Sequence, residues 1–251
     1  MSLEKKIEAE LEEFYLKVEK FGLGSYEVVK DFDGTAQSSE YYAWWYFPEL
    51  IDFHKKSREQ NSLSHIMNIS ILINSAIVIE GFLYELIKQY IGEFIEINNL
   101  EARLNQELNE KLDKSSWNDL KHFYKLAIGN DLNLATSNEN WKSINTLFLY
   151  RNMLTHSKPV KFKVEVINNE PKITHFGSYE NIYKFLIEKK LMKKVDIIKS
   201  MSTDLIDSEI ADYFWDEAQV FINNVLQSNK EFDDMPIRDS YEIAFEYKSN
   251  G

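Results

Sequence analysis

The segment that most constrains the fold is a long apolar stretch without proline. Over residues 62–91 apolar side chains recur at helical spacing, and Asn61 or Ser62 can cap the start. Its most apolar run, residues 69–79, stops at Glu80 and is much shorter than the roughly 20 residues of a membrane span. We therefore expect the middle of a buried helix here, and no membrane as a partner.

Most of the remaining chain also has the pattern of helices. Only 8 of the 251 residues are glycine and 4 are proline, so few positions interrupt a helix. Capping-box spacing marks two helix starts, at Ser116–Asp119 and at Thr136–Glu139. Besides 62–91, helices are predicted over residues 3–20, 41–58 with a possible break at Pro48, 100–112, 116–128, 138–156, 178–190 and 204–228.

A two-residue period replaces the helical one after Pro159, which blocks further helix. Apolar and charged residues alternate over 160–166, a turn follows at 168–171, and residues 172–176 return as a second strand. The tail from Tyr241 to Tyr247 alternates in the same way. We expect it to join the hairpin as a third strand, with its glutamates near Lys161 and Lys163.

Together these patterns predict a mainly α fold. The expected architecture is a helical bundle with a small β-hairpin or three-stranded sheet after the helix 138–156. We expect an N-terminal helical extension over residues 1–60 and a helical core over 61–159. Residues 160–251 would supply the hairpin, two further helices that pack on the core, and the tail strand.

Cysteine is absent, which excludes disulfides and thiolate zinc sites and favours a cytoplasmic location. The first residues, Met-Ser-Leu-Glu-Lys-Lys, do not have the pattern of a signal peptide. The histidines show no metal-binding spacing, and no glycine-rich phosphate loop is present. We therefore predict neither a metal site nor a cofactor.

The net charge of −12 argues against a general nucleic-acid binder, because such proteins need a positive surface. The positive charge is nevertheless concentrated locally. Lys158, Lys161 and Lys163 follow His156 directly, and a second basic stretch covers residues 184–199. These lysines either form a basic rim beside the histidine or are ordinary solvated charges.

The residues most typical of chemistry are Arg151, Asn152 and His156, near the end of one predicted helix. A guanidinium can stabilise negative charge on a phosphate, and an imidazole can transfer a proton near neutral pH. On a helical wheel, Arg151 lies roughly 20° from the centre of the apolar stripe. A charge there is costly unless it is paired or opens onto a polar cleft, and Glu80 is the best candidate partner.

The same residues have a purely structural interpretation. An Arg151–Glu80 pair could hold two helices together, while His156 complements the dipole at the end of its helix. A cleft at a subunit interface would instead leave Arg151 partly hydrated, and the two arrangements are compatible. The spacing alone leaves both open.

The segment Leu-Tyr-Arg-Asn-Met-Leu-Thr-His-Ser-Lys-Pro at 149–159 resembles the signature of the HEPN superfamily (higher eukaryotes and prokaryotes nucleotide-binding). That signature has an arginine, often followed by a polar residue, and a histidine after four to six intervening residues; here Arg151, Asn152 and His156 match. The apolar helix over 71–87, in which Glu80 follows an apolar run, is similar to the first core helix of many members. The resemblance covers residues 62–159.

This resemblance implies an up-and-down bundle of four or more helices. Many members are homodimers whose two motif helices face each other and form one composite site. Many are metal-independent endoribonucleases of toxin–antitoxin, phage-defence or RNA-processing systems, whereas others are inactive modules that bind a protein or a nucleotide. The partners implied are RNA, a second copy of the chain and a separate antitoxin or regulatory protein.

If the site is active, His156 is expected to act as general base or acid on the ribose 2′-hydroxyl and the leaving oxygen. Arg151 would stabilise the phosphorane, and Asn152 would hold the phosphate or orient His156. Glu80 would support Arg151, and Lys158, Lys161 and Lys163 would contact RNA. The alternative is a catalytically inactive binding module.

Overall fold

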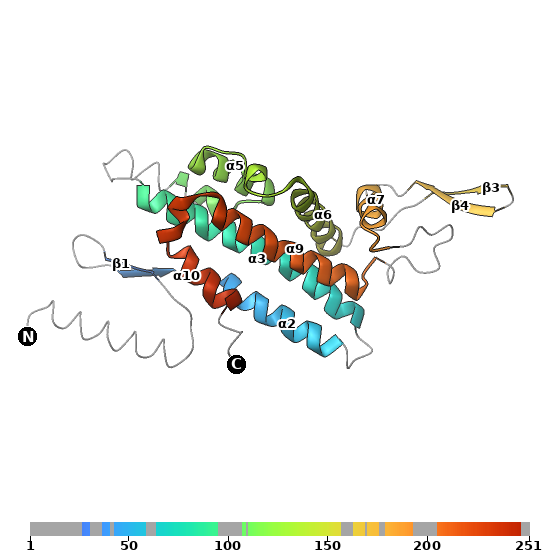
Figure 1. Ribbon diagram of the computed structural model, residues 1–251, viewed down its shortest axis with the longest axis horizontal. Coiled ribbons are helices and arrows are strands. Elements are labelled where there is room, and N and C mark those ends of the chain that lie inside the picture. The colour runs from blue at the N-terminus through green and yellow to red at the C-terminus, as the bar shows by residue number, and fades with distance from the viewer. Residues whose placement is uncertain are drawn as a thin grey trace, which may run out of the picture.

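The computed structural model describes residues 27–30, 37–40, 43–58, 64–94, 107–108, 110–156, 163–168, 170–175, 179–192 and 205–246. Within these ranges the chain is mainly helical, which confirms the predicted class (Figure 1). The predicted helix over residues 3–20 and most of the one over 100–112 lie outside the described residues.

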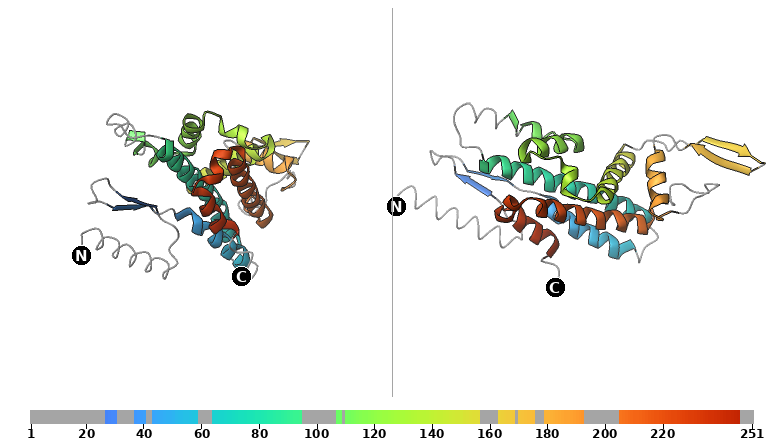
Figure 2. Two further views of the ribbon diagram at one scale, coloured as in Figure 1. Left: turned by 60° about the vertical axis from the view of Figure 1, so that its left-hand side comes forward. Right: turned by 45° about the horizontal axis from the view of Figure 1, so that its top comes forward.

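The longest helix, α3 (Ser64–Phe94), is the centre of the molecule. Helices α2 (Phe47–Arg58), α5 (Trp117–Ile128), α6 (Asn138–Thr155) and α9 (Ser208–Ser228) all contact it, and α9 runs alongside it in both views of Figure 2. Its fully buried side chains include Ile71, Leu72, Ile79, Phe82, Leu83 and Leu86. The apolar run therefore does lie in a buried helix.

By length and composition alone, α3 is also apolar enough to cross a membrane. The 28-residue stretch that qualifies contains an 18-residue window with a mean hydropathy of 1.8, and 56% of that window is buried inside the protein. A core helix surrounded by other helices meets the same criterion, so this property does not distinguish the two cases.

The two predicted capping boxes have different outcomes. Ser116 caps α5 with both reciprocal bonds of the box, as predicted. Helix α6 begins at Asn138 as predicted, but its cap is one residue later, because Ser137 rather than Thr136 accepts the bond from the Asn140 N–H. The Thr136 hydroxyl instead donates to the Asn140 side-chain oxygen at 2.7 Å.

The other helices correspond to predicted segments with shifted ends. The short helix η1 (Ala43–Tyr46) leads directly into α2, and Pro48 lies in the first turn, where a missing N–H is tolerated. Helix α7 (Glu180–Glu188) packs on α6, and Asp207 caps α9. A second short helix, η2 (Leu132–Ala135), joins α5 to α6.

The small sheet expected after α6 is not supported. Strands β3 (Lys163–Ile167) and β4 (Glu170–His175) form only an antiparallel two-stranded ribbon, which extends away from the helices in Figure 1. The turn between them is tighter than predicted, with Asn168 in the left-handed conformation at φ 55°. A second pair, β1 (Glu27–Lys30) with β2 (Gln37–Glu40), forms within the predicted helical extension over residues 1–60.

The predicted tail strand is wrong, because this segment is helical up to Glu246. A short helix η4 (Lys230–Asp234) is followed by α10 (Ile237–Tyr241) and one π-helical turn, η5 (Glu242–Glu246). This turn buries Ala244 and stacks Phe245 on Trp215, with ring centroids 5.7 Å apart. A strand could not place both residues on one core, so burial overrides the alternating pattern.

Candidate functional site

The last two turns of α6 hold the residues that the sequence singled out. Tyr150 and Met153 are buried, and the Tyr150 hydroxyl donates to the Leu205 carbonyl at 3.0 Å. These two side chains fix the rotation of the helix end. That rotation leaves Asn152 and His156 exposed and Arg151 half-buried between the core and the surface.

Arg151 is held on three sides. One terminal nitrogen forms an ion pair with Glu80 of α3, and the other donates to the Asn152 side-chain oxygen at 3.3 Å. Its guanidinium carbon lies 5.6 Å from the centroid of the Phe148 ring. The Arg151 and Glu80 side chains are each 23% exposed, so the pair is desolvated in part but is not sealed inside the protein.

Glu80 is therefore the partner that the helical wheel predicted for Arg151. Burial raises the pKa of the Glu80 carboxyl, and the charge and hydrogen bond of Arg151 oppose that rise. The two side chains come from helices α3 and α6, which are in contact. The pair consequently joins the two helices and orients the guanidinium at the same time.

His156 is the residue that ends α6. Its backbone N–H donates to the Asn152 carbonyl at 3.3 Å. Its imidazole is exposed, and within the described part of the chain no side chain hydrogen-bonds to it. The structure thus brings an arginine, an amide and an accessible imidazole together at one helix end.

Of the three lysines predicted to contact RNA, the structure places Lys163 alone. Lys158 and Lys161 lie outside the described residues. Lys163 is on β3, its side chain is 69% exposed, and it pairs with Glu165 on the same strand at 2.6 Å. The expected neighbours of Lys163, the tail glutamates, are instead on the helical turn η5.

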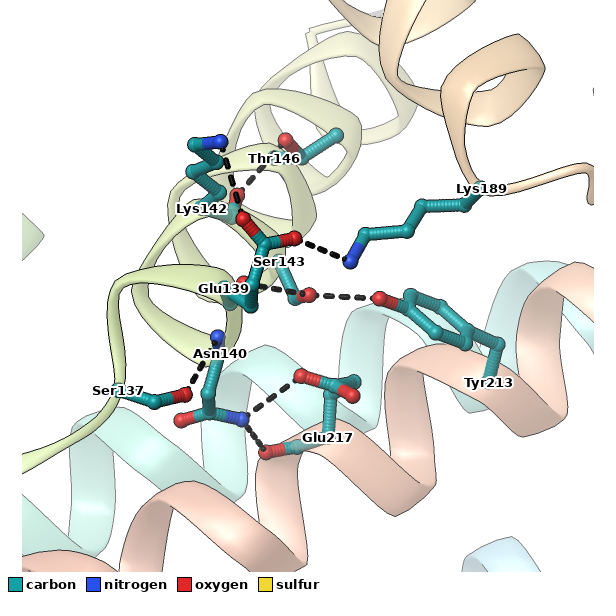
Figure 3. Close-up of polar contacts among 9 residues, drawn as sticks. All are labelled: Ser137, Glu139, Asn140, Lys142, Ser143, Thr146, Lys189, Tyr213 and Glu217. Atoms are coloured by element: carbon teal, nitrogen blue, oxygen red, sulfur yellow. Dashed lines mark hydrogen bonds and ion pairs between the residues drawn. The ribbon is translucent and has the colours of Figure 1, made fainter.

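A second polar cluster lies at the other end of α6 (Figure 3). The Asn140 amide donates to the carbonyl and the carboxylate of Glu217 on α9, at 2.9 and 2.8 Å. The Ser143 hydroxyl lies 2.7 Å from that of Tyr213, whose pKa is raised mainly by burial. Because these groups satisfy one another, we interpret the cluster as the attachment of α6 to α9.

The sequence did not reveal the aromatic support of Arg151. Phe148 stacks on Trp117 of α5, with ring centroids 3.9 Å apart and an interplanar angle of 8°. Phe148 was visible only as one member of the apolar stripe, and Trp117 only as part of a capping box. A contact between helices of this kind leaves no signal in local spacing.

The chemistry available at the helix end is proton transfer and stabilisation of an anion. Arg151 can face a phosphate, and His156 can exchange a proton with a bound hydroxyl. Among the residues that the structure describes, no group of three histidine or acidic side chains is placed to hold a metal ion. Comparison with models of protein families, with curated proteins and with solved structures finds no match to this chain.

Proposed function

We propose that this chain is a metal-independent endoribonuclease of the HEPN type that acts as a homodimer. The observation that carries the proposal is the exposure of Asn152 and His156 beside a half-buried Arg151 at the end of one helix. An accessible imidazole beside a guanidinium supplies the two groups that the proposed cleavage needs.

In the proposed reaction, one His156 imidazole takes the proton of the ribose 2′-hydroxyl, and the 2′-oxygen attacks the adjacent phosphorus. Arg151 stabilises the charge of the five-coordinate phosphorane, and Asn152 holds a phosphate oxygen. The bond to the 5′-oxygen breaks, and the imidazole of the other copy protonates that oxygen. The products are a 2′,3′-cyclic phosphate and a free 5′-hydroxyl.

The finer fold and the setting belong to the same proposal. We interpret α3 and α6 as core helices of an up-and-down bundle of the HEPN type, and the ion pair of Glu80 with Arg151, which joins them, supports this interpretation. A cytoplasmic toxin–antitoxin or phage-defence role, with a separate antitoxin or regulatory protein, is the setting we favour. RNA and a second copy of the chain are the partners.

The test is incubation of purified protein with single-stranded RNA in EDTA. We expect cleavage to 2′,3′-cyclic phosphate ends, with no cleavage of DNA or of 2′-O-methyl RNA, since both lack the attacking hydroxyl. His156→Ala should lose at least about 100-fold in rate. The matched control is His65→Ala, which removes another exposed histidine, at the start of α3.

Dimer dependence has its own readout. If the site is composite, the rate per protein molecule should fall on dilution in step with loss of dimer in size-exclusion chromatography. The proposal fails if folded wild-type protein leaves RNA intact, or if His156→Ala cleaves as fast as the His65→Ala control.

One observation favours the alternative, a catalytically inactive binding module. Arg151 is already paired with Glu80 within the chain, so the guanidinium has a structural role without any ligand. In that case Arg151→Ala and Glu80→Ala should destabilise the fold to a similar extent. Neither variant should cleave RNA, and the wild-type protein should not cleave it either. Expression toxicity that disappears in Arg151→Ala at equal protein level would exclude this alternative.

A further inference from the structure

Lys121, on α5, is a half-buried cation without an anion. Its ammonium nitrogen lies 5.3 Å from the Trp117 ring centroid and 5.9 Å from that of Trp141. Burial lowers the pKa of this ammonium, and no described carboxylate pairs with it. Within the described residues, the charge therefore lies over two indole faces and faces no carboxylate.

The neighbouring charges are arranged differently. Lys125, one turn further along α5, pairs with Asp131 at 2.8 Å. Asp119 accepts the hydrogen bonds of the α5 capping box, and Glu139 pairs with both Lys142 and Lys189. Unlike Lys125, Lys142 and Lys189, Lys121 therefore has no carboxylate partner among the described residues.

A stack of rings connects Lys121 to Arg151. Lys121 lies over Trp117, Trp117 stacks on Phe148 at 3.9 Å, and Phe148 faces the Arg151 guanidinium at 5.6 Å. Trp141 closes the far end, 6.0 Å from Trp117. Two cations and three aromatic rings therefore form one continuous row across helices α5 and α6.

We propose that Lys121 and Trp141 form a binding subsite for single-stranded RNA, one that holds a nucleotide next to the one at Arg151. The ammonium of Lys121 would bind a backbone phosphate, and the partly exposed face of Trp141 would stack an unpaired base. The identity of the ligand rests on the proposed ribonuclease function, whereas the subsite itself rests on the uncompensated charge and the two indoles.

The exchange on binding is favourable on chemical grounds. Lys121 would leave the weak contact with the indoles for a charge-assisted hydrogen bond to phosphate. When the ammonium moves away, an unpaired base can stack on the indole face that it leaves. Stacking of this kind does not depend on the RNA sequence. Since the chain is acidic overall, one uncompensated cation beside an aromatic face gives phosphate a defined point of attachment.

The experiment measures binding without cleavage. In a His156→Ala background, fluorescence anisotropy would follow a labelled ten-nucleotide single-stranded RNA at about 50 mM salt. Lys121→Gln should weaken binding about 10-fold. Lys125→Gln removes the same charge from the same helix and should weaken it less than about 2-fold, because that lysine is already paired.

Three further arms separate the sources of binding. The same RNA as a duplex should bind more weakly, because its bases are not free to stack. An RNA with one abasic position should lose a stacking contact, and AMP tests whether a free nucleotide suffices. Trp141→Phe should keep most of the affinity and lose part of the tryptophan quenching that RNA causes.

Equal losses for Lys121→Gln and Lys125→Gln would overturn the subsite, as would the absence of any binding of single-stranded RNA. Unfolding midpoints of both variants should match, which excludes misfolding as the cause. Binding that depends on Lys121 in a protein without cleavage activity would refute the ribonuclease proposal alone. Cleavage with no special role for Lys121 would refute the subsite alone.

Discussion

Glu85 is a buried carboxylate that accepts hydrogen bonds from four neutral donors, and it forms no ion pair with any described residue. Glu85 is only 1% exposed. The indole N–H groups of Trp44 and Trp45 both donate to one of its oxygens, at 2.6 and 3.0 Å. Gln89 and Ser240 donate to the other oxygen, at 2.8 and 2.7 Å. One carboxylate thereby joins α3 to η1 and α10.

We expect Glu85→Leu to destabilise the protein by about 3 kcal/mol, from the donors it leaves unpaired. Ser240 can turn toward the Pro236 carbonyl, 3.4 Å away, and Gln89 is partly exposed to water. The two buried indoles lose the acceptor that they share, at about 1–3 kcal/mol each, and removal of a buried charge offsets part of that loss.

Glu85→Gln should cost about half as much. The amide oxygen can still accept from both indoles, and its NH₂ group can donate to Ser240. The NH₂ group of Gln89 then faces the new NH₂ group, so two donors meet. The Gln89 amide cannot flip to present its oxygen instead, because that oxygen accepts from the Ile237 N–H at 2.8 Å. One donor is left unpaired, which corresponds to about 1–2 kcal/mol.

The contribution of Glu85 to the free energy of unfolding should also depend on pH. Burial raises the pKa of Glu85, and its four hydrogen bonds only partly oppose this. Above about pH 4.3 the unfolded chain releases this proton while the folded chain still holds it. The contribution of Glu85 to stability is therefore full below that pH and is lost as pH rises through the folded pKa, whereas Glu85→Gln lacks this dependence.

Urea unfolding followed by tryptophan fluorescence and circular dichroism measures these quantities, with unchanged m-values as the check on two-state behaviour. The advantage of wild type over Glu85→Gln should be larger at pH 4 than at pH 7. The reasoning is refuted if the two variants are equally destabilised, or if that advantage grows toward neutral pH.

Three other substitutions test the packing by urea unfolding. Gly81→Ala should destabilise by about 1–3 kcal/mol instead of giving the usual helical gain, because an added Cβ would lie 2.4 Å from the Trp44 Cβ; a gain would contradict the packing. Asn140→Ala should cost about 2 kcal/mol, because a residue 3% exposed loses both bonds to Glu217; a cost below about 0.5 kcal/mol would contradict the structural role of that cluster. Ser116→Ala should cost about 1 kcal/mol through the capping box, and Ser116→Asp should restore most of it.

Local patterns were enough to predict the features that depend on one helix. The apolar segment gave α3 within three residues at each end, and Ser116 gave the start of α5. The position of Arg151 in an apolar stripe was enough to require a partner, and Glu80 was the acidic residue on the most buried helix. The two helix inferences used information within about a turn of the residue concerned, whereas the choice of Glu80 combined the patterns of two helices.

Features that depend on distant parts of the chain could not be predicted in this way. The donors of Glu85 are as far away as Ser240, 155 positions along the chain. The tail alternates over so few residues that a strand and a helical turn fit equally well, and its contacts with Trp44 and Trp215 decide for the helix. The role of Lys121 also emerges only when two helices are brought together.

The polar residues of α3 explain how so apolar a helix has one register. Asn68 donates to the Ile206 carbonyl ahead of α9, and Ser70 lies 3.0 Å from the His54 ring nitrogen on α2. Glu80 pairs with α6, and Glu85 binds η1 and α10. A shift of α3 by one residue would rotate it by about 100° and separate all four from their partners, while its apolar side chains would lose far less. The polar groups therefore select the arrangement that the apolar surface stabilises, and the same selection aims Arg151 at the end of α6 where the proposed chemistry needs it.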